Sequence, residues 1–399
     1  MRYLVVVALF VLSMITYIDR VCIATAKDPI AADLGLSDSA MGMVFGAFAL
    51  GYAIAQIPSG WFADKAGPRA ALTTVVAAWS GLTALTGAAW NLVSLTVIRF
   101  LFGIGEAGAF PGSTRAIINW LPPGERGRAN GVLFSGSRIG AAFAFPLLAW
   151  MLSKWDWRTC FVLLGFAGLV WAAGWLLWFR NHPAVPVPVG PLTDRPEIGI
   201  RDVFRSGPMA LAMTQYFASN FTFFICLSWM LPYLKKQYQL TDGQAATYAM
   251  APLLLGATSQ WFAGWIVDRL YRSPMRAWSR RIPGIAGFVL AAAAMFAITQ
   301  ATTPLAAVLC FTLAAFGADM TISPSWVFCA DLAGKNAGSV SGSMNMLGNF
   351  GSFVSANAFP FLQQTTGSAS TYFVLAGVLN LVAIWCWYCM RSLDHREQT

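Results

Sequence analysis

The chain has 399 residues, of which 57% are hydrophobic and only 11% are charged. An ordinary soluble domain carries roughly 25% charged residues, so this composition excludes a soluble globular protein. The net charge of +9 suggests nucleic acid at first sight, but the positions of the basic residues along the chain argue against such a partner.

Twelve apolar stretches, each long enough for a membrane-spanning helix, follow one another along the chain. They cover about residues 3–25, 41–63, 70–89, 93–114, 129–152, 159–180, 208–233, 245–267, 283–301, 304–328, 337–361 and 370–390. We interpret the first as a span and not as a removable signal segment, because no small-residue cleavage site follows it.

The connections between spans are short except for residues 181–207, which are rich in proline and polar residues. Such a composition is typical of a linker. We therefore expect an all-α membrane protein with an N-terminal bundle at 1–180, a cytoplasmic linker at 181–207 and a C-terminal bundle at 208–399.

Lys and Arg residues are distributed unevenly between the two ends of these spans. If the N-terminus lies in the cytoplasm, 17 of the 26 basic residues lie on the inner side, five lie outside, and Arg20, Arg99, Arg115 and Arg138 lie within spans. Because basic residues favour the cytoplasmic side, both termini are predicted to be cytoplasmic. This bias also accounts for the positive net charge without nucleic acid.

The two halves of the chain repeat a short motif. The segment GWFADK at 60–65 follows the second predicted span, and GWIVDR at 264–269 follows the eighth, 204 residues later. A repeat at half the chain length predicts two pseudo-symmetric six-helix bundles, as in some transporter folds.

The segment GWFADKAGPR at 60–69 resembles the loop signature of the major facilitator superfamily. A narrower resemblance, to the anion:cation symporter family, comes from YIDR at 17–20, RFLFGIGEAGAFPG at 99–112, GSRIGAA at 136–142, SPSW at 323–326 and GSMNMLGN at 342–349. Members of that family carry galactonate, hexuronates, glucarate, tartrate or phthalate, and sialate and vesicular glutamate carriers are related to them. This resemblance implies the major facilitator fold and, in bacteria, proton-coupled uptake of an organic carboxylate across the inner membrane.

Three acids lie clearly inside the predicted spans: Asp19, Glu106 and Asp319. A charge in the bilayer is costly, so it usually faces a cavity or a partner. His182 and His395 lie outside the spans, which leaves carboxyl groups as proton carriers. The family resemblance assigns proton coupling to Asp19 and Glu106, with Arg99 as a supporting ion-pair partner. The alternative is that Asp19–Arg20 and Arg99–Glu106 are static pairs, and the role of Asp319 is left open because it lies near a span end.

Arg20 and Arg138 are the candidate cations for a substrate carboxylate, since a guanidinium binds a carboxylate through two parallel hydrogen bonds. Galactonate-type members have a neutral amide near the position of Arg138. The added cation indicates a second carboxylate or a stronger hold on one, and it argues against galactonate itself. An ion pair with a neighbouring helix is the alternative for Arg138.

Polar and aromatic residues at helical spacing complete the predicted substrate site. They are Tyr17 beside Arg20, Tyr52 by resemblance, Ser323 with Trp326, and Asn345 with Asn349. Ordinary packing is the alternative for the aromatic residues.

The repeated loop motif suggests a cytoplasmic gate. Asp64 with Arg69, and Asp268 with Arg269, are expected to form ion pairs or helix-end contacts that hold the inner side closed. A simple solvated loop is the alternative.

We expect alternating access, in which protonation of Glu106 and Asp19 weakens their hold on Arg20 and Arg99 and frees a guanidinium for the substrate. The coupling ion is expected to be H⁺, without other cofactor or metal, in a monomer within the lipid bilayer. A proton-coupled exporter, a facilitator and an anion exchanger are the alternatives. The chain has no HExxH motif, no GxxxxGK[ST] loop and no Ser/His pairing in its spans, which argues against an enzyme.

Overall fold

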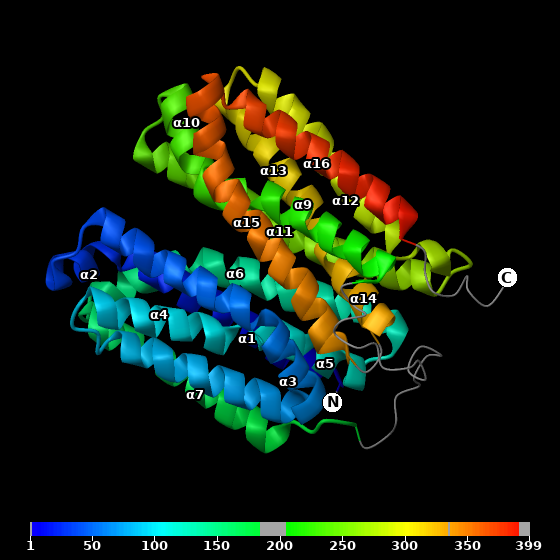
Figure 1. Ribbon diagram of the computed structural model, residues 1–399, viewed down its shortest axis with the longest axis horizontal. Coiled ribbons are helices and arrows are strands. Elements are labelled where there is room, and N and C mark those ends of the chain that lie inside the picture. Colours follow the sequence, from blue (N-terminus) through cyan, green and yellow to red (C-terminus); the bar gives the residue numbers. More distant parts are fainter. Residues whose placement is uncertain (1, 184–204, 334–335, 391–399) are drawn as a thin grey trace. The chain divides into compact units, whose positions relative to one another are not determined.

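The computed structural model describes residues 2–183, 205–333 and 336–390 (Figure 1). Helices and short turns make up these residues, and no β-strand occurs among them. Most of the predicted linker, residues 184–204, lies outside the described residues, as do Lys335 and His395. The division into 1–180, 181–207 and 208–399 therefore stays a prediction.

The helices before the linker are α1 (Arg2–Thr25), α2 (Lys27–Leu34), α3 (Asp38–Thr86), α4 (Leu92–Glu106), α5 (Ala109–Trp120), α6 (Arg126–Leu152) and α7 (Trp157–Trp178). Those after it are α9 (Gly207–Ser228), α10 (Met230–Tyr238), α11 (Asp242–Tyr271), α12 (Arg281–Ala297), α13 (Pro304–Met320), α14 (Ile322–Ala333), α15 (Ala337–Thr366) and α16 (Ser370–Cys389). Short 3₁₀ turns occupy Pro123–Glu125, Arg276–Trp278 and Ile298–Gln300. Each of the twelve predicted spans coincides with helix, which confirms the predicted fold class.

Local sequence fixes where several of these helices begin and change direction. Asn91 caps α4 by accepting a hydrogen bond from the backbone N–H of Ser94, and Thr241 caps α11 in the same way through Gln244. Such caps satisfy the N–H groups that a helix leaves unpaired at its start. Within α3, Gly67 has φ 77° and ψ 158°, so the helix axis changes there between the second and third predicted spans.

Three predicted spans are each divided into two helices. The breaks follow Glu106, Ser228 and Met320, and a proline lies five, four and four residues further on: Pro111, Pro232 and Pro324. Because proline has no N–H to bond the carbonyl four residues before it, the helical hydrogen-bond ladder is interrupted at that point. The first and third breaks place Glu106 and Asp319 at helix ends.

The chain folds into two compact units. Unit 1 comprises Met1–Pro122, Gly136–Glu197 and Gly334–Met346, and unit 2 comprises Pro123–Ser135, Ile198–Ala333 and Leu347–Thr399. In unit 1, α3 runs beside α4 and α7, and in unit 2, α12 runs beside α13 and α16 (Figure 1). Thus the start of α15 belongs to unit 1 and the start of α6 belongs to unit 2.

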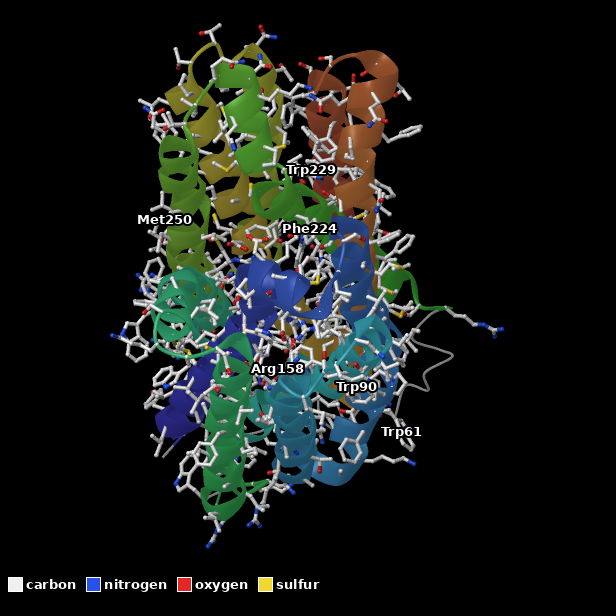
Figure 2. The ribbon with its side chains drawn as sticks, turned by 90° about the vertical axis from the view of Figure 1, so that its left-hand side faces the viewer. Trp61, Trp90, Arg158, Phe224, Trp229 and Met250 are labelled. Atoms are coloured by element: carbon white, nitrogen blue, oxygen red, sulfur yellow. The ribbon has the colours of Figure 1, made fainter. Side chains whose placement is uncertain are left out.

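Large apolar side chains lie on the outside of the helices. On α7, for example, Phe166 is 64% exposed and Leu177 is 83% exposed, whereas Phe161 is buried. Trp61 and Trp90 likewise project from unit 1 (Figure 2). Among the described residues, eight helical segments have the length and apolar composition that a bilayer crossing requires. An apolar exterior around buried charges is the arrangement expected in lipid.

Candidate transport site

The interior of unit 1 contains a cluster of ionisable side chains from two helices. Asp19 on α1 and Arg99 and Glu106 on α4 are each at most 1% exposed. The side chain of Arg20, next to Asp19 on α1, is 18% exposed. Three of these four charged residues are therefore buried, and Arg20 is partly buried.

Arg20 forms an ion pair with Glu106, through its Nε and the carboxylate Oε1. The guanidinium also lies over three aromatic rings, with its Cζ 4.4 Å from the ring centre of Tyr52, 5.0 Å from Tyr17 and 5.3 Å from Phe48. Aromatic faces attract a cation and exclude water from it. Arg20 is therefore held by one carboxylate inside an aromatic enclosure, and its Nη2 has no hydrogen-bond partner among the described residues.

Asp19 turns toward a different helix. Its Oδ2 accepts a hydrogen bond of 3.2 Å from the indole Nε1–H of Trp79, which is fully buried on α3. Consecutive helical residues point about 100° apart, which explains how Asp19 faces α3 while Arg20 faces α4. Trp79 was not identified from the sequence, because a single tryptophan in an apolar span gives no signal of a polar role.

Arg99 belongs to the same cluster but makes fewer hydrogen bonds than Arg20. Its Cζ is 4.3 Å from the ring centre of Phe102, and both Asp19 and Glu106 exert attraction on its charge. Its Nε and Nη1 have no hydrogen-bond partner among the residues that the structure describes. The sequence left open a static ion pair between Arg99 and Glu106. In the structure, Glu106 forms its hydrogen bond and ion pair with Arg20.

The start of α15 contributes an amide to unit 1. The Nδ2 of Asn345 donates to the hydroxyl of Tyr52 and to the Oε1 of Gln56, both at 3.2 Å. Tyr52 also faces Arg20, so Asn345 and Arg20 share an aromatic neighbour. The structure therefore brings together Tyr17, Arg20, Tyr52 and Asn345 of the predicted substrate set, and Gln56 bonds to Asn345 beside them.

Unit 2 holds the other part of the predicted set. The indole Nε1–H of Trp326 on α14 donates to the hydroxyl of Tyr216 on α9 at 2.9 Å, and its ring lies 4.9 Å from that of Phe134 on α6. Ser323 donates from its hydroxyl to the backbone carbonyl of Gly127 at 2.8 Å. Trp326 and Ser323 thus lie close to the same part of α6.

The remaining predicted residues take separate positions. Arg138 is buried on the part of α6 that belongs to unit 1. Gly136 and Gly140 on either side of it pack against Phe10 and Met14 of α1, so the side of α6 that carries Arg138 faces away from α1. Asn349 is half-buried on α15, and Asp319 is fully buried at the end of α13.

The two aspartates of the repeated loop motif make equivalent contacts. Asp64 accepts hydrogen bonds of 2.8 Å from the backbone N–H groups of Gly338 and Ser339, at the start of α15. Asp268 accepts from the N–H groups of Gly127 and Arg128 at the start of α6, at 2.8 and 3.0 Å. A carboxylate at a helix N-terminus binds the unpaired N–H groups and the positive end of the helix dipole.

Arg69 and Arg269, the basic residues of the two motifs, contact other groups. The guanidinium of Arg69 donates to the carbonyl of Leu176, near the end of α7. Arg269 lies over the ring of Trp265, with its Cζ 5.8 Å from the ring centre. The sequence allowed either ion pairs within the motif or helix-end contacts, and the aspartates make helix-end contacts. Asp268 also forms an ion pair with Arg128, at 3.1 Å.

Comparison with known proteins identifies the family. The model of the Major Facilitator Superfamily matches residues 9–356. A probable sulfoacetate transporter of Cupriavidus necator is 34% identical, covering 95% of this chain and 91% of that protein. A probable L-galactonate transporter of Escherichia coli is 31% identical over 93% and 85%, and a hexuronate transporter of Bacillus subtilis is 28% identical over 95% and 92%.

Solved structures agree on the fold. The human organic anion transporter MFSD10 has a TM-score of 0.75 at 16% identity, over 97% of this chain and 99% of that one. The fucose:proton symporter FucP of E. coli has a TM-score of 0.73 at 13% identity, over 97% of each chain. Both structures have the fold of a membrane transporter. The relatives named above are also transporters and not enzymes. The chain therefore belongs to the major facilitator superfamily, as a secondary transporter similar to the anion:cation symporters of organic acids.

Proposed function

We propose that this transporter takes up a small organic carboxylate together with protons, by alternating access across the cytoplasmic membrane. The names of its relatives support an acid substrate, since they include sulfoacetate, galactonate and hexuronate transporters. Both termini lie in the cytoplasm in this proposal, and the working unit is the monomer.

The observation that carries the proposal is the ion pair between Arg20 and Glu106 inside unit 1. When Glu106 is ionised, its carboxylate occupies the guanidinium that a substrate carboxylate would need. Protonation of Glu106 removes the negative charge and weakens the pair, because the guanidinium then bonds a neutral carboxyl group and no longer an anion. The guanidinium then becomes available to the substrate within its aromatic enclosure.

Asp19 supplies a second proton-binding carboxyl group. It lies beside Arg20 in the chain, is buried, and shares the attraction of Arg99 with Glu106. Protonation of both acids leaves Arg20 and Arg99 with less negative charge around them, which favours an incoming anion. Asp19 and Glu106 are thus the coupling residues, and Arg99 supports both.

The substrate residues in this proposal are those that the sequence predicts. Tyr17, Tyr52 and Asn345 surround Arg20 in unit 1 and offer hydroxyl and amide groups. Ser323, Trp326 and Asn349 contribute from unit 2. Arg138 is the second cation, and it favours a substrate with two acid groups over one with a single carboxylate.

The helix-end contacts of Asp64 and Asp268 serve as the cytoplasmic gate in this proposal, together with Arg69 and Arg269. Each carboxylate binds two backbone N–H groups at the start of a long helix. Such contacts can break and re-form without unfolding either helix, which suits a gate that opens once per transport cycle.

Uptake into proteoliposomes tests the coupling. Wild-type protein should accumulate a labelled substrate when the outside is acidic, and Glu106→Gln should lose this accumulation. Because the neutral amide resembles the protonated acid, Glu106→Gln should retain exchange of substrate across the membrane in the absence of a gradient. Glu125→Gln, the same change at a residue beside Arg272 and outside the spans, should leave coupling unchanged. Uptake by the wild type that does not respond to the pH gradient would rule out proton symport.

A further inference from the structure

The side-chain amide of Gln260 is an unexplained polar group in unit 2. Gln260 lies on α11, is fully buried, and neither its Oε1 nor its Nε2 has a hydrogen-bond partner among the described residues. The buried amides of Gln56, Asn130 and Asn380 each keep one bond. Leaving both ends of a buried amide unpaired costs stability, so such a group in a native fold calls for an explanation.

Gln260 and Gln56 occupy corresponding positions in the two repeats. They are 204 residues apart, as are the two copies of the loop motif that follow them. The backbone carbonyl of Gln56 lies against Gly342 of α15, and the backbone carbonyl of Gln260 lies against Gly131 of α6. The two repeats differ three residues further along the partner helix. On α15 this residue is Asn345, whose amide donates to Gln56, and on α6 it is Phe134. A phenyl ring has no group that can bond the Gln260 amide.

The position of Gln260 connects it with the predicted substrate residues of unit 2. Gly127 packs on Gly264 and Gly131 packs on Gln260, so α6 and α11 run antiparallel in close contact. Ser323 bonds the carbonyl of Gly127, and Trp326 packs on Phe134. Gln260, Ser323 and Trp326 therefore border the same two turns of α6.

We propose that Gln260 binds a hydroxyl group of the transported acid, and that it selects hydroxy acids. The inference rests on the proposed function, because it adds this residue to the substrate residues that the proposal assigns in unit 2. An amide has both a donor and an acceptor, and a hydroxyl group can satisfy both at once. A carboxylate or sulfonate oxygen would bond the Nε2–H but would oppose the Oε1, so an acid group fits this position less well.

Substrate-induced thermal shifts of the purified protein test this assignment. The probes are galactarate and D-glucarate, which carry two carboxylates and several hydroxyl groups, and sulfoacetate, which carries two acid groups and no hydroxyl group. Gln260→Met should weaken binding of a hydroxylated probe about tenfold, which corresponds to about 1.4 kcal/mol, and should leave sulfoacetate binding unchanged. Because the variant removes an unpaired amide, its melting temperature without probe should not fall. Gln260→Asn, which retains an amide on a shorter side chain, should weaken the hydroxylated probe less than Gln260→Met does.

Gln215→Met is the matched control. Gln215 is also a fully buried glutamine of unit 2, but its amide bonds Ser325 and Trp387. Its loss should lower the melting temperature without changing the preference between hydroxylated and unhydroxylated probes.

The outcomes separate this inference from the proposed function. Equal weakening of all probes by Gln260→Met, or no weakening, would overturn the assignment of Gln260 while leaving proton coupling in place. Binding of sulfoacetate alone by the wild type would overturn it as well. If the wild type binds none of these acids, the proposed function itself fails.

Discussion

At the scale of single residues, the central feature is a guanidinium whose carboxylate partner can be neutralised. Arg20 is held by Glu106 on one side and by the rings of Tyr17, Phe48 and Tyr52 on the others. A planar guanidinium suits both contacts, since it stacks on aromatic faces and bonds a carboxylate at its edge. A lysine ammonium would retain the charge but not this geometry.

Arg20→Lys should therefore weaken substrate binding roughly 10- to 100-fold, the range expected for the loss of a charge-assisted hydrogen bond. Titration of the purified protein with a bound acid measures this. Arg158→Lys is the control, because Arg158 bonds the carbonyls of Gly87 and Ala89 and the carboxylate of Asp33, away from the buried charges. Unchanged binding by Arg20→Lys would show that the guanidinium geometry is not used.

The sequence predicted which residues carry the charges but not how they pair. Asp19, Arg20, Arg99 and Glu106 stand out because ionisable residues are rare in apolar spans. The alternative of static pairs joined Asp19 to Arg20 and Arg99 to Glu106 within single helices, whereas the hydrogen bonds run between helices, from Arg20 to Glu106 and from Trp79 to Asp19. Pairing between helices depends on packing, which no local pattern reveals. For the same reason, Gln56, Tyr216 and Gln260 were not identified.

At the scale of helices, the periodic apolar stretches predicted the spans well, and the differences have local causes. The helix α2 (Lys27–Leu34) was not predicted because it is too short and polar to resemble a span. The breaks after Glu106, Ser228 and Met320 follow from prolines further along the chain. Other prolines, such as Pro58 and Pro146, lie inside continuous helices. Proline alone therefore does not determine whether a span divides.

Close contact between helices depends on glycine at the start of α15. A Cβ on Gly338 would overlap the backbone carbonyl of Gly60 on α3. Gly338→Ala should therefore destabilise the protein by about 1–3 kcal/mol, as overpacked side chains do, and thermal unfolding in detergent measures the loss. Gly174→Ala is the matched control, because a Cβ there meets nothing within 4 Å, and alanine should stabilise that helix by about 0.5–1 kcal/mol. A similar response from both variants would contradict the close contact.

At the scale of the whole molecule, the repeat that the loop motif indicated extends to the partners of its aspartates. Asp64 and Asp268 are 204 residues apart, and the helix starts that they bind, at Gly338 and Gly127, are 211 residues apart. The two units therefore make the same kind of aspartate contact at a helix start, but they differ in their buried charged residues. Unit 1 holds Asp19, Arg20, Arg99 and Glu106, whereas the buried acids in the described part of unit 2 are Asp319 and the gate residue Asp268. Proton coupling is accordingly assigned to unit 1, and part of the substrate selection to unit 2.

Substrate affinity as a function of pH tests the central claim most directly, because binding to purified protein involves neither a gradient nor a transport cycle. Protonation of Glu106 frees Arg20, so wild-type affinity should rise as the pH falls. Glu106→Gln leaves Arg20 free at every pH, so its affinity should be high and should lose most of this dependence. Wild-type affinity that is independent of pH, or a Glu106→Gln variant that retains the full wild-type dependence, would contradict control of Arg20 by the Glu106 proton.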